Sequence, residues 1–205
     1  MLGRMAVLQA LVVVAYPVTV YFALGIASPR VVALCTLALL AARLAVISPE
    51  RLAAFARVFA PIAVAYAATS VASLVWNDPL GLLLAPAVFD FALLAVFAAS
   101  FAQRETVVEA LARAQVGALG AEEHAYCRRV TGMWCAFFFA NGAVSGFLAL
   151  AGSRESWALY TGVIAYLCMG ALFAAEYVYR HWRFRRYVGA PTDTLLRRLF
   201  PPKAP

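Results

Sequence analysis

Long apolar stretches without basic residues alternate with short connections that carry Arg and Lys along most of this chain. A helix needs about 20 apolar residues to cross the roughly 30 Å hydrocarbon core of a bilayer, with every backbone polar group paired within the segment. Six stretches meet this requirement: residues 5–27, 31–47, 55–76, 80–101, 130–151 and 157–179. The pattern therefore predicts an all-α fold, a polytopic membrane bundle of six transmembrane helices joined by short loops.

Composition excludes a water-soluble globule. Of the 205 residues, 65% are hydrophobic and only 13% are charged, which is too little polar surface for a soluble protein of this size. The net charge of +7 suggests a nucleic-acid partner in a soluble protein, but here the charges lie at the ends of spans. We therefore interpret the basic residues as determinants of membrane topology and expect no nucleic-acid partner.

The basic residues also predict an orientation. With six spans, all of the 17 Arg and Lys residues except Arg30 and Arg154 lie on one side of the membrane, from Arg4 to Lys203. The positive-inside rule then places both termini of this multi-pass chain in the cytoplasm. The alternative of a cleaved signal peptide at the N-terminus is disfavoured because the first apolar run is too long and contains Pro17.

The connections leave little room for a soluble domain. The longest, residues 103–129, predicts an interfacial helix between spans four and five, ended by Gly117 and Gly120. Its expected polar face holds Glu105, Glu109 and Arg113, and its expected apolar face holds Val108, Leu111 and Ala112. The triplet Ser48-Pro49-Glu50 predicts the start of the third helix. We expect a transmembrane domain over residues 1–187 and a basic amphipathic cytoplasmic tail over 188–205.

Asp90 lies near the middle of the fourth stretch, where an acidic residue costs about 2.5–3.5 kcal/mol on insertion scales. It must be neutral, paired, or in contact with a wet cavity. One interpretation makes it a proton or ligand site. The other is a protonated carboxyl that hydrogen-bonds to a neighbouring helix.

Polar and aromatic residues recur every three or four positions on the last two spans and so define one face of each helix. On the fifth span these are Thr131, Trp134, Phe138, Asn141 and Ser145, with Gly142 and Gly146 alongside for close helix approach. On the sixth they are Gly162, Tyr166, Met169, Phe173, Glu176 and Arg180. These faces predict either a helix-packing seam or a groove for a lipid or substrate.

Charged residues gather at the cytoplasmic ends of the same two spans. Glu176 precedes Arg180 by four residues, the favourable order for a local ion pair. Arg128 and Arg129 serve either as topology anchors or as contacts for a phosphate or carboxylate head group. The candidate lipid or head-group contacts are Arg128, Arg129, Thr131, Trp134, Asn141, Tyr166, Glu176 and Arg180.

Other chemistry finds little support. Cys35, Cys127, Cys135 and Cys168 have no C-x-x-C spacing, and the two histidines have no partner at metal-ligand spacing. The sequence contains no H-E-x-x-H, G-x-S-x-G or P-loop motif. We expect no metal site, no cofactor and no assigned catalytic residue.

The last two spans also carry a family resemblance. Its residues are Tyr126-Cys127-Arg128-Arg129-Val130-Thr131, Trp134-Cys135, Phe137-Phe138, Asn141-Gly142, Trp157, Tyr160, Gly162, Tyr166, Met169-Gly170, Phe173 and Glu176. They resemble a family of small bacterial inner-membrane proteins encoded in aryl-polyene and fatty-acid-synthase-like pigment gene clusters. The resemblance is specific from Tyr126 to Arg180 and looser elsewhere. The family favours an amide near Asp90, which makes this carboxylate a weak catalytic candidate.

A fainter resemblance, over Trp134 to Gly142, is to intracellular septation proteins and implies an envelope-organising role.

Three functions remain open. The resemblance implies a non-enzymatic accessory or scaffold for assembly of a lipid-linked or polyene envelope product, which would hold cytoplasmic acyl-carrier or polyene-synthesis enzymes at the membrane. The alternatives are a lipid or polyene carrier with a groove between spans five and six, and a membrane-embedded transferase that uses Asp90 or Glu176 as general base. Membrane lipids are expected partners in each case, and the oligomeric state is open.

Overall fold

The computed structural model describes residues 16–46, 49–187 and 192–201. Only the part of the predicted first span from Tyr16 onward is therefore described. Arg4, Ser48, Lys203 and the predicted boundary between domain and tail at residue 188 lie outside the described residues.

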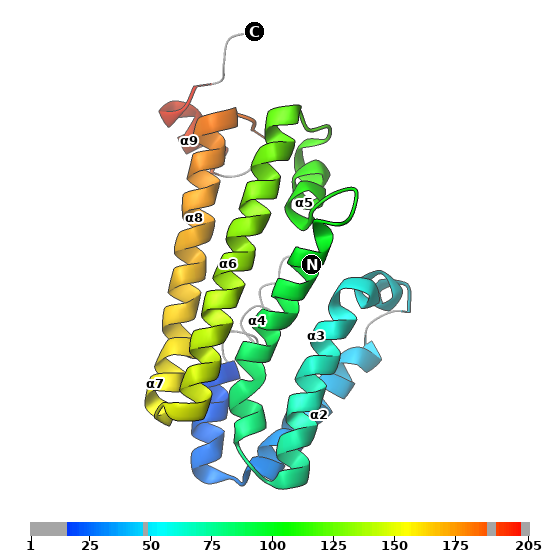
Figure 1. The fold of residues 1–205 in the computed structure, drawn as a ribbon, viewed down its shortest axis with the longest axis vertical. Helices are drawn as coiled ribbons and strands as arrows, with labels where there is room; N and C mark the ends of the chain where they lie inside the picture. The colour runs from blue at the N-terminus through cyan, green and yellow to red at the C-terminus, as the bar shows by residue number, and fades with distance from the viewer. Residues whose placement is uncertain (1–15, 47–48, 188–191, 202–205) are drawn as a thin grey trace. The chain divides into compact units, whose positions relative to one another are not determined.

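The described residues are helical and contain no strand, which confirms the predicted all-α class (Figure 1). A helix over Tyr16–Ile26 comes first. The labelled helices follow: α2 (Pro29–Val46), α3 (Pro49–Trp76), α4 (Leu80–Ser100), α5 (Val107–Val116), α6 (Ala121–Ala151), α7 (Arg154–Leu159), the π-helical turn η1 (Tyr160–Ile164), α8 (Ala165–Phe184) and α9 (Asp193–Leu199). The helix predicted between spans four and five is α5, and the predicted start of the third helix at Pro49 is confirmed.

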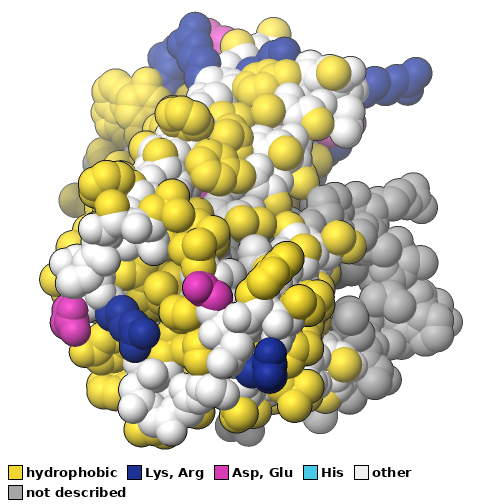
Figure 2. Space-filling model, turned by 60° about the horizontal axis from the view of Figure 1, so that its bottom comes forward, with side chains coloured by type: hydrophobic (Ala, Val, Ile, Leu, Met, Phe, Trp, Pro, Cys, Tyr) yellow, Lys and Arg dark blue, Asp and Glu magenta, His cyan; other side chains and the backbone are white. Residues whose placement is uncertain are grey.

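Three helices are long and apolar enough to cross a membrane: Leu80–Ser100, Ala121–Ala151 and Arg154–Phe184. The segments Tyr16–Ile26, Pro29–Ala42 and Ala63–Trp76 are apolar but shorter within the described residues. Large apolar side chains are exposed on several helices, including Leu39 (70%) and Phe147 (65%). Figure 2 shows hydrophobic side chains over much of the visible surface, with Lys and Arg in a few separate places. Such a surface is compatible with a membrane protein, whose apolar side chains contact lipid.

The chain divides into two compact units, one of Met1–Val96 with Phe137–Tyr166 and the other of Phe97–Ala136 with Leu167–Pro205. Helix α6 contributes residues to both. The expected division into a domain over 1–187 and a tail over 188–205 stays a prediction.

In the first unit, a proline inside α4 sets the packing. Pro86 has no N–H for the carbonyl of Leu82, one turn earlier. The Tyr16 hydroxyl donates to that carbonyl at 3.1 Å, and the Trp157 indole Nε1–H donates to the carbonyl of Leu83 at 2.9 Å. The Tyr16 bond satisfies the carbonyl that Pro86 leaves without a helical donor, a group for which lipid would offer no partner. The two bonds also join the Tyr16–Ile26 helix and α7 to α4.

Arg30, one of the two basic residues predicted on the far side of the membrane, caps the C-terminus of α3. Its Nε donates to the carbonyl of Leu74 at 3.0 Å, and a terminal guanidinium nitrogen donates to that of Val75 at 3.3 Å. The Arg30 backbone N–H donates to Oδ1 of Asn77, whose φ of 51° is left-handed. The carbonyl end of a helix favours a cation, so this charge has a local structural role.

Helix α4 starts in close contact with α3. Gly81 lies so near the Thr69 carbonyl that a Cβ at this position would collide with it. The buried Ser73 hydroxyl accepts a bond from the backbone N–H of Leu82 at 3.0 Å, which satisfies a first-turn donor of α4. Glycine at position 81 is what allows this approach.

In the second unit, the segment after α8 contacts α8. The Tyr177 hydroxyl bonds to the Thr192 hydroxyl, and the Tyr187 hydroxyl donates to the carbonyl of Phe200. In α9, Leu196 is buried, whereas Leu195 (62%) and Leu199 (61%) are exposed. A short helix, α9, thus lies within the predicted tail, and the amphipathic character expected of the tail stays a prediction.

Candidate functional site

The second unit contains a groove of about 380 Å³ lined by α5, α6 and α8. Its lining residues are Val108, Leu111, Ala112, Gln115, Tyr126, Cys127, Val130, Trp134, Phe173, Ala174, Glu176, Tyr177 and Arg180. Three of the eight predicted contact residues, Trp134, Glu176 and Arg180, belong to this set. The groove thus combines part of the predicted site with α5, which the sequence predicted only as an interfacial helix.

The apolar part of the groove is aromatic. The rings of Trp134 and Phe173 have centroids 4.4 Å apart, which confirms that the predicted faces of the last two spans meet at this level. Trp134 is buried at 6% exposure, whereas Phe173 is 56% exposed. One ring therefore forms the floor of the groove, and the other is open to an apolar partner.

The polar part of the groove centres on Glu176. Its Oε1 accepts a bond from the Tyr126 hydroxyl at 3.2 Å and lies 3.3 Å from Nε of Arg180. The predicted local ion pair between Glu176 and Arg180 is therefore present. The Arg180 guanidinium also lies over the Tyr177 ring, 5.8 Å from its centroid. Glu176 pairs with Arg180 through Nε, and the two terminal nitrogens of that guanidinium make no hydrogen bond with the described residues.

A smaller cavity of about 120 Å³ extends the polar part. It shares six lining residues with the groove, among them Tyr126 and Arg180, and adds others such as Glu123 and Arg186. Trp134 and Glu123 are eleven residues apart on α6, a helical distance of about 16 Å. The two cavities together run from an aromatic end to a charged end.

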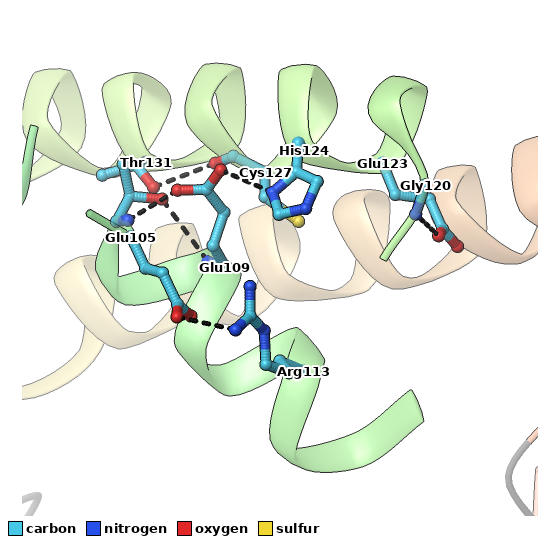
Figure 3. A network of polar contacts seen from close by, with 9 residues as sticks. Glu105, Glu109, Arg113, Gly120, Glu123, His124, Cys127 and Thr131 are labelled. Carbon is cyan, nitrogen blue, oxygen red and sulfur yellow. Dashed lines mark hydrogen bonds and ion pairs between the residues drawn. The ribbon is translucent and has the colours of Figure 1, made fainter. Parts of the chain in front are cut away.

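Helix α5 is held against α6 by a buried carboxylate, shown in Figure 3. Thr106 and Glu109 form a capping box, in which the Thr106 backbone N–H donates to Glu109 Oε2 at 2.5 Å. Glu109 Oε1 lies 3.1 Å from Nδ1 of His124 on α6. Burial of Glu109 opposes ionisation, but the bonds from Thr106 and His124 outweigh it and lower the pKa of this carboxyl. These contacts fix one wall of the groove.

This arrangement corrects the predicted faces of α5. Glu109, expected on the polar face, is buried at 3% exposure, and Leu111, expected on the apolar face, is 58% exposed. Glu105 precedes the helix, although its expected proximity to Arg113 is confirmed by a 2.8 Å ion pair. The reason is the N-terminal position of Glu109 in α5, where the capping box turns its side chain inward.

A second polar site lies in the first unit. Asn141 Nδ2 donates to Asp90 Oδ2 at 2.7 Å, and the Tyr160 hydroxyl donates to Asn141 Oδ1 at 2.9 Å. Asp90 (4% exposed) and Asn141 (7%) are both buried. Tyr166 is also electrostatically coupled to Asp90. Asn141 and Tyr166, predicted as head-group contacts, thus belong to the surroundings of the predicted intramembrane acid.

The remaining predicted residues do not line the groove. Thr131 is fully buried and bonds to the carbonyl of Cys127 in its own helix at 2.9 Å. Arg128 lies over the Phe101 ring, 5.3 Å from its centroid, and Arg129 is exposed. Sequence reasoning missed the roles of α5 and of Tyr126 and Tyr160. The only available signal for the two tyrosines was their place in the family resemblance.

The described residues contain no group of three or more His, Cys, Asp or Glu side chains that could hold a metal ion. No protein-family model, curated protein or solved structure matches the chain. The functional argument therefore rests on the residues and their geometry.

Proposed function

We propose that this chain is a multi-pass protein of a bacterial inner membrane, with six spans and both termini in the cytoplasm. The three long apolar helices and the three shorter apolar segments support this arrangement. The charge distribution supports the orientation, because the two basic residues outside the cytoplasmic set, Arg30 and Arg154, lie in the first turns of α2 and α7, next to short connections.

We further propose that the protein binds an amphipathic molecule in the groove of the second unit, without catalysing a reaction on it. The observation that carries this proposal is the polarity gradient of the groove, from Trp134 and Phe173 at one end to Glu176 and Arg180 at the other. An acyl or polyene chain suits the aromatic end, because its apolar surface would cover the exposed Phe173 ring. A membrane lipid and a fatty-acid-like product share this chemistry.

The polar end of the groove suits an anionic head group. The planar guanidinium of Arg180 can bind a carboxylate or phosphate through its terminal nitrogens while Glu176 keeps Nε in place. The Tyr126 hydroxyl restrains Glu176 in turn. The same pairings argue against Glu176 as a general base, because its carboxylate is already bound by two partners.

The predicted recruitment of cytoplasmic acyl-carrier or polyene-synthesis enzymes stays a second proposal. The expected partner surface is the basic cluster of Arg183, Arg185 and Arg186. Two of these arginines form internal ion pairs: Arg183 with Glu122 at 3.3 Å and Arg186 with Glu123 at 2.8 Å. Reversing these charges would therefore disturb the protein itself as well as any partner surface. The geometry gives the groove the stronger support.

Photo-crosslinking tests groove binding. The full-length protein in lipid nanodiscs is labelled with a fatty acid and with a phosphatidylglycerol, each carrying a diazirine near the end of its chain, and the labelled peptides are mapped. We expect labels around Trp134 and Phe173. Arg180→Gln should weaken capture about tenfold or more, since a hydrogen bond to a charged group contributes about 1.5–3 kcal/mol.

Matched variants make the result specific. Arg129→Gln removes an exposed arginine outside the groove, and Phe147→Ala removes an exposed ring on the α6 segment of the other unit, as the control for Phe173→Ala. We expect both controls to label like the unmodified protein. Equal labelling of the Arg180→Gln protein, or labels spread evenly over all exposed apolar residues, would refute the proposal. Preference for one of the two probes would identify the head group.

A further inference from the structure

Asp90, Asn141 and Tyr160 form a polar cluster in the first unit, the Asp90 cluster, and none of the three lines the groove. Asp90 is halfway along the 21-residue α4 and is the only charged residue in that helix. Its hydrogen-bond partner is the Asn141 amide, and no Lys, Arg or His side chain in the described part of the chain bonds to it. A lone carboxylate in a membrane-spanning helix is costly, whereas a protonated carboxyl is not.

The hydrogen bonds of the cluster are compatible with both the charged and the neutral form of the Asp90 carboxyl. Tyr160 donates to Asn141 Oδ1, so the amide is oriented with Nδ2 toward Asp90. That Nδ2–H bonds to Oδ2 whether Asp90 is charged or neutral, which leaves Oδ1 as the atom that gains or loses the proton. Asn141 thus stabilises the charged form without neutralising it.

The backbone around the cluster is irregular on two elements. Pro86 interrupts the α4 hydrogen-bond ladder one turn before Asp90. Tyr160 begins the π-helical turn η1, a feature that often marks functional sites in helices. These two departures from regular helix occur on the elements that supply the carboxyl and the tyrosine hydroxyl.

A third element, α6, lies close to α4 because two of its residues at the contact, Gly142 and Gly146, have no side chain. A Cβ at Gly142 would lie 3.1 Å from the Asp90 Cβ, and one at Gly146 would lie 3.6 Å from that of Ala87. One turn beyond Asn141, the Ser145 hydroxyl is 1% exposed and makes no hydrogen bond with the described residues. A buried hydroxyl of this kind can relay a proton, because it can both donate and accept.

From this geometry we propose that Asp90 is a proton-binding site, at which the carboxylate takes up a proton from water on Oδ1 and later returns it. The titratable groups around it are Tyr160, through Asn141, and Tyr166 from α8. The inference depends on the membrane location of α4 but not on ligand binding in the groove.

Infrared difference spectroscopy of the full-length protein in nanodiscs tests the proposal. We expect a carboxylic-acid C=O band that disappears when the pH is raised from about 5 to about 9 and returns when the pH is lowered, as reversible loss and uptake of the Asp90 proton requires. The band should be absent from the Asp90→Asn protein and present in Glu155→Gln, which removes an exposed carboxylate. A carboxyl that stays protonated, or stays ionised, over the whole range would overturn the proposal.

A second variant separates proton binding from simple packing. Tyr160→Phe removes the hydroxyl that orients Asn141 but keeps the ring, so the titrating band should persist with a shifted midpoint. An unshifted midpoint in a protein that folds normally would contradict the assigned role of Tyr160. Crosslinking in the groove of the Asp90→Asn protein reports separately on amphiphile binding, so either proposal can fail without the other.

Discussion

The hydrogen bond from Tyr16 to Leu82 allows a sharp test of how the first unit is held together. Proline at position 86 deprives the Leu82 carbonyl of its normal helical donor, and the Tyr16 hydroxyl replaces that donor at 3.1 Å. Tyr16→Phe removes only the hydroxyl. The ring, which packs edge-on against Tyr66 with centroids 5.5 Å apart, is kept.

The expected loss of stability follows from the Leu82 carbonyl, which Tyr16→Phe leaves without a hydrogen-bond donor. A buried backbone acceptor left without a donor costs about 1–3 kcal/mol, so Tyr16→Phe should lower the free energy of unfolding by that amount. Pro86→Ala restores an N–H that can bond to Leu82 within α4. In the Pro86→Ala background, Tyr16→Phe should therefore cost less than about 0.5 kcal/mol.

The assay is reversible unfolding in mixed micelles of increasing denaturing-detergent content, measured for the unmodified protein, both single variants and the double variant. The double-mutant cycle should give a coupling of about 1–2 kcal/mol between positions 16 and 86. If the two effects add to within about 0.3 kcal/mol, Tyr16 does not compensate for Pro86 and the reasoning fails.

Three further predictions concern the other contacts. Gly81→Ala should lower the free energy of unfolding by about 1–3 kcal/mol in the same assay, because the new methyl group meets α3. Glu109→Gln should cost about 0.5–2 kcal/mol through the weakened capping box with Thr106. The pKa of Glu109 is lowered in the folded protein, so its contribution should be complete above the unfolded pKa and lost as the pH falls through the folded pKa, a dependence that Glu109→Gln should abolish. Arg186→Gln should cost at most about 1 kcal/mol, because its ion pair with Glu123 is partly exposed, and added salt should shrink the difference.

Local sequence patterns predicted the helices and the buried face of α6. Thr131, Trp134, Phe138, Asn141 and Ser145 are all buried. Spacing of three and four residues fixes a helix face whatever the neighbours are, so this prediction needs no tertiary information. The close approach expected at Gly142 and Gly146 also occurs, and the partner helix is α4.

The site itself could be predicted only in part. Periodicity placed Trp134, Asn141 and Glu176 on faces, but it cannot tell which residues of distant segments those faces meet. The contact of Asn141 with both Asp90 and Tyr160 depends on the relative rotation of three elements. The sequence pattern predicted one lipid or head-group contact surface that included Trp134, Asn141 and Glu176. In the structure, Trp134 and Glu176 line the groove, whereas Asn141 bonds to the buried Asp90.

The proposed orientation of the chain is the claim most directly open to measurement, since the expected cytoplasmic location of Glu176 and Arg180 depends on it. In a variant lacking the four native cysteines, Arg154→Cys and Glu122→Cys each place one thiol at an exposed position. Intact spheroplasts are treated with a membrane-impermeant maleimide. We expect immediate labelling at position 154 and labelling at position 122 only after the membrane is permeabilised; the reverse order, or immediate labelling at both, would contradict the account.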